Sequence, residues 1–297
     1  MMGPVLLPNE PRASNPMTTD SWKPDYHCHT TFSDGVLDVP ALVARAHEKG
    51  VTSLAITDHD TIAGLAHARP LCAELGMELI TGIELSCQWQ GLNIHVVGLA
   101  FDDSHPVIVA MEEDLYRRRE ERAKTIAQRL EKAGFPGLLE KAKAQAGQGQ
   151  IGRPHFARAM VEAGFVKDMT VAFKKHLGAG KPGDVKAEWP EFPEAIGWIK
   201  AAGGIAVLAH PDKYKLTRSK LLKLIESFVA AGGEAVEVVG PQLDPNFQGS
   251  LVKTCEKYAL KGSLGSDFHN PCPWSELGRL KPLPSALQPV WAHWRTN

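Results

Sequence analysis

The amino-acid sequence predicts an α/β fold, either a barrel or a doubly wound sheet, in which helices connect parallel strands. From Asp25 onward, short runs of β-branched and apolar residues alternate with amphipathic stretches, which is the pattern of successive βα units. The chain has 297 residues and is 43% hydrophobic, so it can bury a full core. No internal repeat divides it.

Seven runs are expected to be strands, and they lie at residues 25–28, 52–57, 78–86, 93–100, 205–209, 235–239 and 262–266. A helix should connect the first two strands, because Asp38 suits the N-cap, Pro40 suits the first turn, and Gly50 supplies a stop. Seven strands are one fewer than the usual eight of an α/β barrel.

A long segment separates the fourth strand from the fifth. Residues 111–133 should form a helix, whereas 134–190 are rich in Gly, Lys and Ala and contain no strand pattern. Within them, the Ala-, Lys- and Gln-rich stretch at 141–150 is expected to be a loop. We therefore predict a disordered tail at 1–23, a main domain built from 24–103 and 191–297, and a helical insertion at 104–190.

Composition argues against several classes of protein. The formal net charge of −1 gives no overall positive field, which disfavours a binder of long duplexes. The five cysteines are an odd number without CxxC spacing, which suits reduced thiols and a cytoplasmic location. No apolar run approaches the roughly 20 residues of a membrane span, so no membrane contact is expected. No obligate protein partner is indicated.

Metal-binding side chains follow or lie within most of the predicted strands. Since alternate residues of a strand point the same way, the imidazoles of His27 and His29 can share one ion. Any one such residue is more often an ordinary packed polar group. The carboxyl ends of strands, however, are where α/β folds build their sites. The full candidate set is His27, His29, Asp34, His59, Glu84, His95, His210, Asp267 and His269.

Nine ligands exceed the needs of one tetrahedral or octahedral ion. Two or three ions, bridged by Glu84, Asp267 or water, would satisfy them. Mixed imidazole and carboxylate donors suit Mn²⁺, Zn²⁺ or Fe²⁺.

The motifs HxH at His27, TDHD at Thr57, AHP at Ala209 and SDFH at Ser266 occur in that order. Through them the chain resembles the PHP (polymerase and histidinol phosphatase) family. More narrowly, it resembles the subgroup of nucleoside 3′,5′-bisphosphate phosphatases and ribonuclease AM-like 5′-to-3′ exonucleases. The resemblance implies a distorted seven-stranded (β/α) barrel capped by a small helical domain, with the nine residues holding three divalent metal ions. Because Asp34 stands where some relatives carry histidine, Mn²⁺ or Mg²⁺ is favoured over Zn²⁺ at that site, and Mn²⁺ is our first choice.

The same resemblance implies a phosphatase that removes the 3′-phosphate of a nucleotide such as adenosine 3′,5′-bisphosphate. Exonuclease action on short single-stranded RNA or DNA would use the same centre. A metal-bound hydroxide is the expected nucleophile, and the sequence indicates no general acid.

Substrate contacts are expected from the insertion. Arg153 and His155 lie in an RPH motif like that of the subgroup, and Lys181 adds a further cation. A guanidinium fits phosphate in a bidentate way. Arg118, Arg119 and Arg122 are weaker candidates, because charged residues on a helix are usually solvated.

Two other functions stay open. A histidinol phosphatase would need an acidic residue in the insertion to hold the substrate ammonium, and we identify none. A structural metal-binding module is the non-enzymatic alternative, and the open, hydrophilic rim argues against it.

Overall fold

The computed structural model describes residues 22–185 and 189–295 of the chain. Most of the predicted tail lies outside these residues. Trp22 and Lys23, which we assigned to that tail, pack on the main body: the Trp22 ring lies 4.6 Å from that of Trp291, and the Lys23 amide donates to Thr52 Oγ1.

Seven strands form one sheet in sequence order. They are β1 Pro24–Asp25, β2 Ser53–Ile56, β3 Glu78–Trp89, β4 Leu92–Leu99, β5 Ile205–Leu208, β6 Ala235–Val239 and β7 Lys261–Leu264. The sheet curls until its first and last strands meet, where Tyr26 N donates to Leu264 O and His29 N donates to Phe268 O. The distorted seven-stranded barrel is therefore confirmed.

The expectation that all strands run parallel is wrong for one strand. β4 is antiparallel to both β3 and β5, while the other neighbouring pairs are parallel. The cause is the two-residue connection between β3 and β4, in which Gln90 and Gly91 have φ of 51° and 74°. Two successive positive φ values are typical of the tight hairpin turns that join antiparallel strands.

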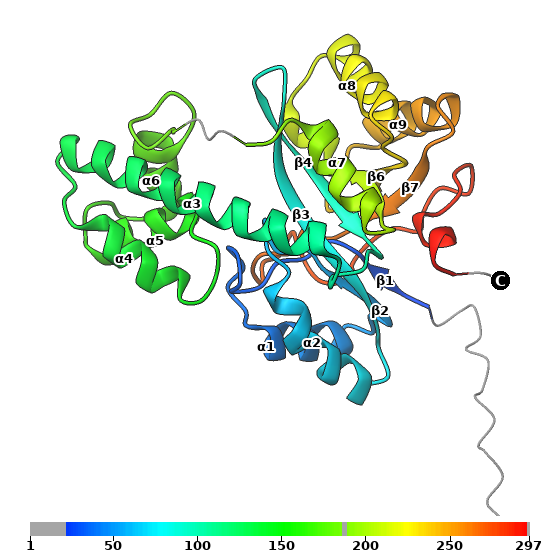
Figure 1. Cartoon of the computed structure of the whole chain (residues 1–297), viewed down its shortest axis with the longest axis horizontal. Coiled ribbons are helices and arrows are strands. Elements are labelled where there is room, and N and C mark those ends of the chain that lie inside the picture. The colour runs from blue at the N-terminus through cyan, green and yellow to red at the C-terminus, as the bar shows by residue number, and fades with distance from the viewer. Residues whose placement is uncertain (1–21, 186–188, 296–297) are drawn as a thin grey trace, which may run out of the picture.

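The helices of the barrel cover the outside of the sheet (Figure 1). They are α1 Val39–Glu48, α2 Ala63–Glu74, α7 Phe192–Ala201, α8 Arg218–Ala230 and α9 Pro245–Lys257, with 3₁₀ turns η3 Pro211–Tyr214 and η4 Val290–His293. The predicted capping of α1 is confirmed, because Asp38 accepts a hydrogen bond from the Ala41 amide at 2.9 Å. Gly50, with φ of 75°, follows its end. Among the helices of the described residues, none has the length and apolar character needed to cross a membrane.

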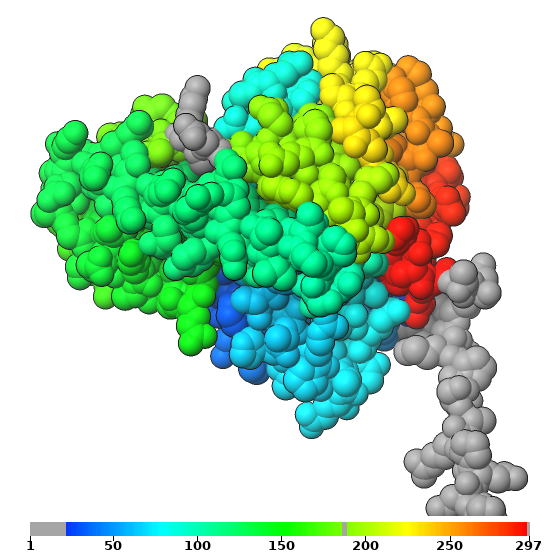
Figure 2. Space-filling model, viewed as in Figure 1, coloured from blue at the N-terminus to red at the C-terminus, as the bar shows by residue number. Residues whose placement is uncertain are grey.

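The insertion forms a lobe beside the barrel (Figure 2). Its elements are α3 Pro106–Lys132, α4 Leu138–Ala146, α5 Arg153–Glu162, α6 Met169–Ala172 and the π-helix η2 Phe173–Leu177. The first half of α3 packs Ile108 and Leu115 into the barrel's core, whereas its second half packs Ile126 and Leu130 into a separate apolar cluster of the lobe. One continuous helix thus ties the lobe to the barrel.

The loop predicted at 141–150 is wrong, since α4 extends to Ala146. Leu138, Ala142 and Ala146 recur every fourth residue and are buried against the lobe's cluster. A stripe made mostly of alanine is weakly apolar, which is why the pattern did not stand out as a helix.

Candidate metal centre

The nine predicted ligands meet at one rim of the barrel. Seven follow strands β1, β2, β5 and β7, while Glu84 and His95 lie inside β3 and β4. Glu84 was expected at a strand end, but β3 continues to Trp89. Because β4 runs antiparallel, His95 reaches the same rim from the first half of its strand, where it pairs with Ser86 of β3.

Glu84 is at the centre of the cluster. Its side chain is only 1% exposed, and its two oxygens lie within about 3 Å of five imidazoles. Oε2 is 3.2, 3.2 and 3.1 Å from nitrogens of His27, His29 and His59, and Oε1 is 2.8 and 2.9 Å from nitrogens of His95 and His210. A single carboxylate can therefore act as a bridge between neighbouring ions.

Three overlapping groups of ligand atoms could each hold a cation. In each group, all the donor atoms lie within 4.8 Å of one another. The groups are His29, Asp34, His59 and His269; His27, His29, Glu84 and Asp267; and His59, Glu84 and His95. His210 joins the third group through its contact with Glu84.

Buried polar atoms without a well-formed hydrogen bond fit this interpretation. Among the described residues these include Asp34 Oδ1, His59 Nδ1, Glu84 Oε2 and His210 Nδ1, although His59 Nδ1 and Glu84 Oε2 lie 3.1 Å apart. Burying such atoms is costly unless something else coordinates them. Burial alone would raise the pKa of the Glu84 carboxyl, but the imidazoles around it hold that pKa well below its ordinary value. The surroundings of Glu84 therefore favour an ionised carboxylate whose lone pairs can coordinate a cation.

Glu237 of β6 supports the centre, and our sequence reasoning missed it. This buried carboxylate lies 2.6 Å from Nδ1 of His27 and accepts a hydrogen bond from the His210 amide at 2.7 Å. Such a partner fixes the ring orientation of a ligating histidine. Glu237 is the one charged residue in the apolar run 235–239. Because a carboxylate inside an apolar strand is costly to bury without partners, this pattern could have revealed it.

Asp58 fixes the loop that carries Asp34. Its carboxylate is 1% exposed and accepts hydrogen bonds from Thr30 N at 2.7 Å, Thr30 Oγ1 at 2.6 Å and Ser33 Oγ at 2.6 Å. The loop after β1 is therefore held by a residue that follows β2.

A buried ion pair joins the insertion to the metal centre. Arg119 of α3 donates through Nε to Asp60 at 2.7 Å and through Nη2 to Ser86 Oγ at 3.2 Å. Asp60, fully buried, also accepts from the Ser86 amide at 2.6 Å. Asp60 follows the candidate ligand His59, and Ser86 lies two residues after the candidate ligand Glu84. One guanidinium therefore holds both segments.

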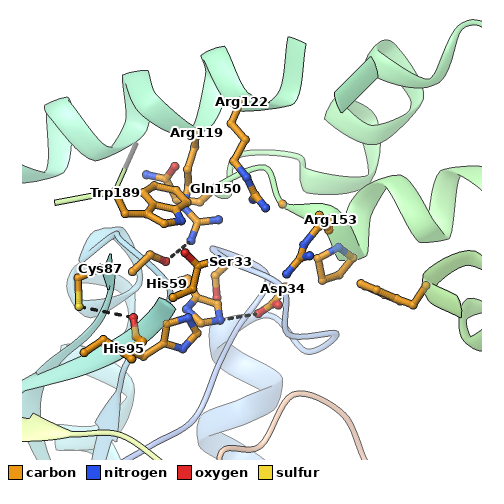
Figure 3. Close-up of a pocket in the computed structure, with 16 residues that line it drawn as sticks. Ser33, Asp34, His59, Cys87, His95, Arg119, Arg122, Gln150, Arg153 and Trp189 are labelled. Carbon is orange, nitrogen blue, oxygen red and sulfur yellow. Dashed lines mark hydrogen bonds and ion pairs between the residues drawn. The ribbon is translucent and has the colours of Figure 1, made fainter. Parts of the chain in front are cut away.

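A cavity of about 180 Å³ separates the insertion from the centre. Figure 3 shows Arg119 and Arg122 of α3 and Arg153 of α5 on one side of it, facing Asp34 and His59. Burial and the nearby guanidinium groups of Arg153 and Arg119 lower the pKa of Arg122 to about 9. Positive charge thus accumulates opposite the candidate metal ligands.

The predicted substrate contacts have different positions. Arg153 lines the cavity, where it donates to Leu177 O at 3.2 Å. His155 does not line it: the ring is 1% exposed, and its Nδ1 accepts a hydrogen bond from Gly152 N, at the start of α5. Lys181 is exposed and also lies off the cavity lining. Direct substrate contact by these last two side chains is not supported by this geometry.

Comparisons with known proteins agree with the geometry. Residues 25–201 match the model of the PHP domain. The chain is 46% identical over 269 residues to a 5′-3′ exoribonuclease of Haemophilus influenzae, covering 91% of this chain and 98% of that protein. It is 37% identical over 269 residues to a 3′,5′-nucleoside bisphosphate phosphatase of Chromobacterium violaceum, covering 90% and 94%. Among solved structures, an amidohydrolase from Chromobacterium violaceum with bound sulfate and no metal superposes with a TM-score of 0.84 at 36% identity, covering 91% of this chain and 95% of that one.

Proposed function

The chain belongs to the PHP family, and from that premise we propose that it is a metal-dependent phosphoesterase that removes the 3′-phosphate of nucleoside 3′,5′-bisphosphates. We also propose that the same centre releases nucleotides from the 5′ end of short single strands. The relatives named for these two activities each align with about nine-tenths of the chain.

The observation that carries the proposal is the pairing of a metal-ligand rim with a cationic wall across one small cavity. A nucleoside bisphosphate carries two phosphates that need separate anion sites. The rim suits the phosphate that is hydrolysed, and Arg122 with Arg153 suits the one that stays. Because Arg119 is already paired with Asp60, it contributes positive charge to the cavity and holds Asp60 in place. It does not contact the phosphate directly.

We assign three ions to the rim, with Mn²⁺ favoured, because three overlapping donor groups combine imidazole and carboxylate ligands. When bound, such ions polarise phosphoryl oxygens and lower the pKa of a coordinated water. The protein's own part is to hold the nine ligands, to brace them through Glu237, Asp58 and Asp60, and to place the second phosphate against Arg122 and Arg153.

The cavity lining argues against the histidinol phosphatase alternative. Of the described residues that line it, Asp34 is the one carboxylate, and it belongs to the candidate metal rim. The insertion's side presents guanidinium groups, which repel a substrate ammonium.

Removing Arg153 tests the proposal. Arg153→Ala should reduce kcat/KM for adenosine 3′,5′-bisphosphate far more than for adenosine 3′-monophosphate, because the second substrate lacks the phosphate to be gripped. A lost charge-assisted contact is worth about 1.5–3 kcal/mol, or roughly ten- to over a hundredfold. Arg117→Ala, an exposed arginine of α3, is the matched control. Equal losses on both substrates, at matched metal content, would refute the phosphate-gripping role.

A further inference from the structure

A second, small void of about 20 Å³ touches the candidate metal rim. Its charged and imidazole lining consists of His210, Asp212, Lys213, Glu237 and Asp267. Val239, Gly240, Pro241 and Leu243 line both this void and a wider hollow of about 300 Å³. The two spaces therefore lie next to each other, on either side of the segment 239–243.

This hollow, here called the distal groove, has the chemistry of a nucleic-acid site. It is bordered by Pro241, Gln242, Gln248, Trp274, Arg279 and Lys281. In the part of the chain that the structure describes, its lining includes two exposed cations and no carboxylate. Single-stranded nucleic acid is bound by this combination of cations for the backbone and an aromatic ring for the bases.

Trp274 is the most informative residue of the groove. Its side chain is 61% exposed, more than any other large hydrophobic residue in the described part of the chain. The segment that bears it is fixed by a hydrogen bond of 2.7 Å from Arg279 to Pro273 O and by a bridge between Cys272 and Ser275. An indole held out to solvent by an ordered loop offers a face on which a base can stack.

We propose that the distal groove binds the nucleotides on the 3′ side of the scissile phosphate when the substrate is a single-stranded oligonucleotide. The 5′-terminal nucleotide then occupies the insertion-side cavity, the scissile phosphate lies on the metal rim, and the rest of the strand leaves past Pro241 with a base against Trp274 and phosphates near Arg279 and Lys281. The inference rests on the proposed function. A nucleoside bisphosphate has nothing beyond its 3′-phosphate and leaves the groove unused.

Charge and continuity favour this occupant over an apolar protein segment. An apolar peptide docking on Trp274 alone would gain nothing from the two cations or from the neighbouring metal rim. A polyanion that is cut at the rim gains from both.

Kinetics on two substrates test the groove. The substrates are adenosine 3′,5′-bisphosphate and a 5′-phosphorylated single strand of five nucleotides that begins with adenosine. Trp274→Ala should lower kcat/KM for the oligonucleotide about fivefold or more, as expected for one lost base stack, and change that for the bisphosphate less than twofold. Tyr116→Ala, which removes another exposed aromatic side chain from α3, is the matched control and should alter neither.

Binding gives a second measurement that does not depend on turnover. The probe is the same oligonucleotide with a 3′ fluorophore, titrated with metal-depleted protein at several salt concentrations and followed by anisotropy. Lys281→Ala should weaken binding and reduce the slope of log K against log salt by about 0.7, the value for one phosphate contact on a single strand. Lys220→Ala, an exposed lysine of α8, should leave the slope unchanged.

The outcomes separate the groove from the enzyme's basic activity. Equal losses on both substrates in Trp274→Ala would refute the proposed role of the distal groove. The role would also be refuted if Trp274→Ala caused no loss on the oligonucleotide and Lys281→Ala left the salt slope unchanged. Failure of the metal-loaded wild-type protein to hydrolyse either substrate would instead overturn the proposed function.

Discussion

Removing Arg119 should destabilise the protein strongly, although the residue is on a surface helix. The substitution Arg119→Met keeps an unbranched stem but leaves Asp60, which is fully buried, without its cation. Breaking a buried pair by deleting one partner costs about 3–5 kcal/mol. In a chain of this size that lowers Tm by roughly 6–20 °C.

A matched control comes from the same helix. Arg117 is 68% exposed and pairs with Asp114, so Arg117→Met should cost no more than about 1 kcal/mol. The assay is urea unfolding followed by circular dichroism, with all variants at the same saturating metal concentration. The double variant Asp60→Asn/Arg119→Met should be more stable than the sum of the single effects predicts, because the unpaired charge is gone.

The ion pair between Arg119 and Asp60 also predicts a functional effect. Since Arg119 reaches Asp60 and Ser86, beside the proposed ligands His59 and Glu84, its loss should weaken metal affinity together with stability. If Arg119→Met unfolds at the same urea concentration as Arg117→Met and retains its metal, then the ion pair does not support the centre.

Three further predictions follow from the site. Glu84→Ala should abolish hydrolysis and reduce bound metal in elemental analysis while the circular dichroism spectrum is preserved, and full metal content would show that Glu84 is not a ligand. Glu237→Gln should lower metal affinity about 10–100-fold, as is usual for a lost partner of a ligating histidine, which a competitive chelator titration would measure; unchanged affinity would reduce Glu237 to a packing role. Burial lowers the pKa of His155 to about 4, below the value of about 6.5 in the unfolded chain. The stability that the neutral ring contributes is therefore complete above pH 6.5. It is lost as the pH falls toward 4, which lowers the unfolding free energy by about 3 kcal/mol. The difference in unfolding free energy between wild type and His155→Gln should therefore shrink over that interval, and a constant difference would contradict the assignment.

The sequence alone determined the order of the barrel elements and the candidate ligands. Both depend on local patterns: the strands are short apolar runs, and the ligands stand at or near strand ends, as His27, His59, His210 and Asp267 do. Since strand ends in an α/β barrel share one rim, local position was enough to predict that these side chains converge. The cap of α1 was predictable for the same reason, because Asp38 acts on its own helix.

Only the tertiary structure decided which charged residues do what. Arg119, Arg122 and Arg153 look equivalent in the sequence, yet the structure separates them. Arg119 is paired with the buried Asp60, whereas Arg122 donates to Val185 O and Arg153 lies 3.7 Å from the partly exposed Asp184. The role of Glu237 depends on His27, 210 residues away in the chain. Such roles are set by partners distant in sequence, and the free energy of a buried charge depends on those partners instead of on its neighbours along the chain.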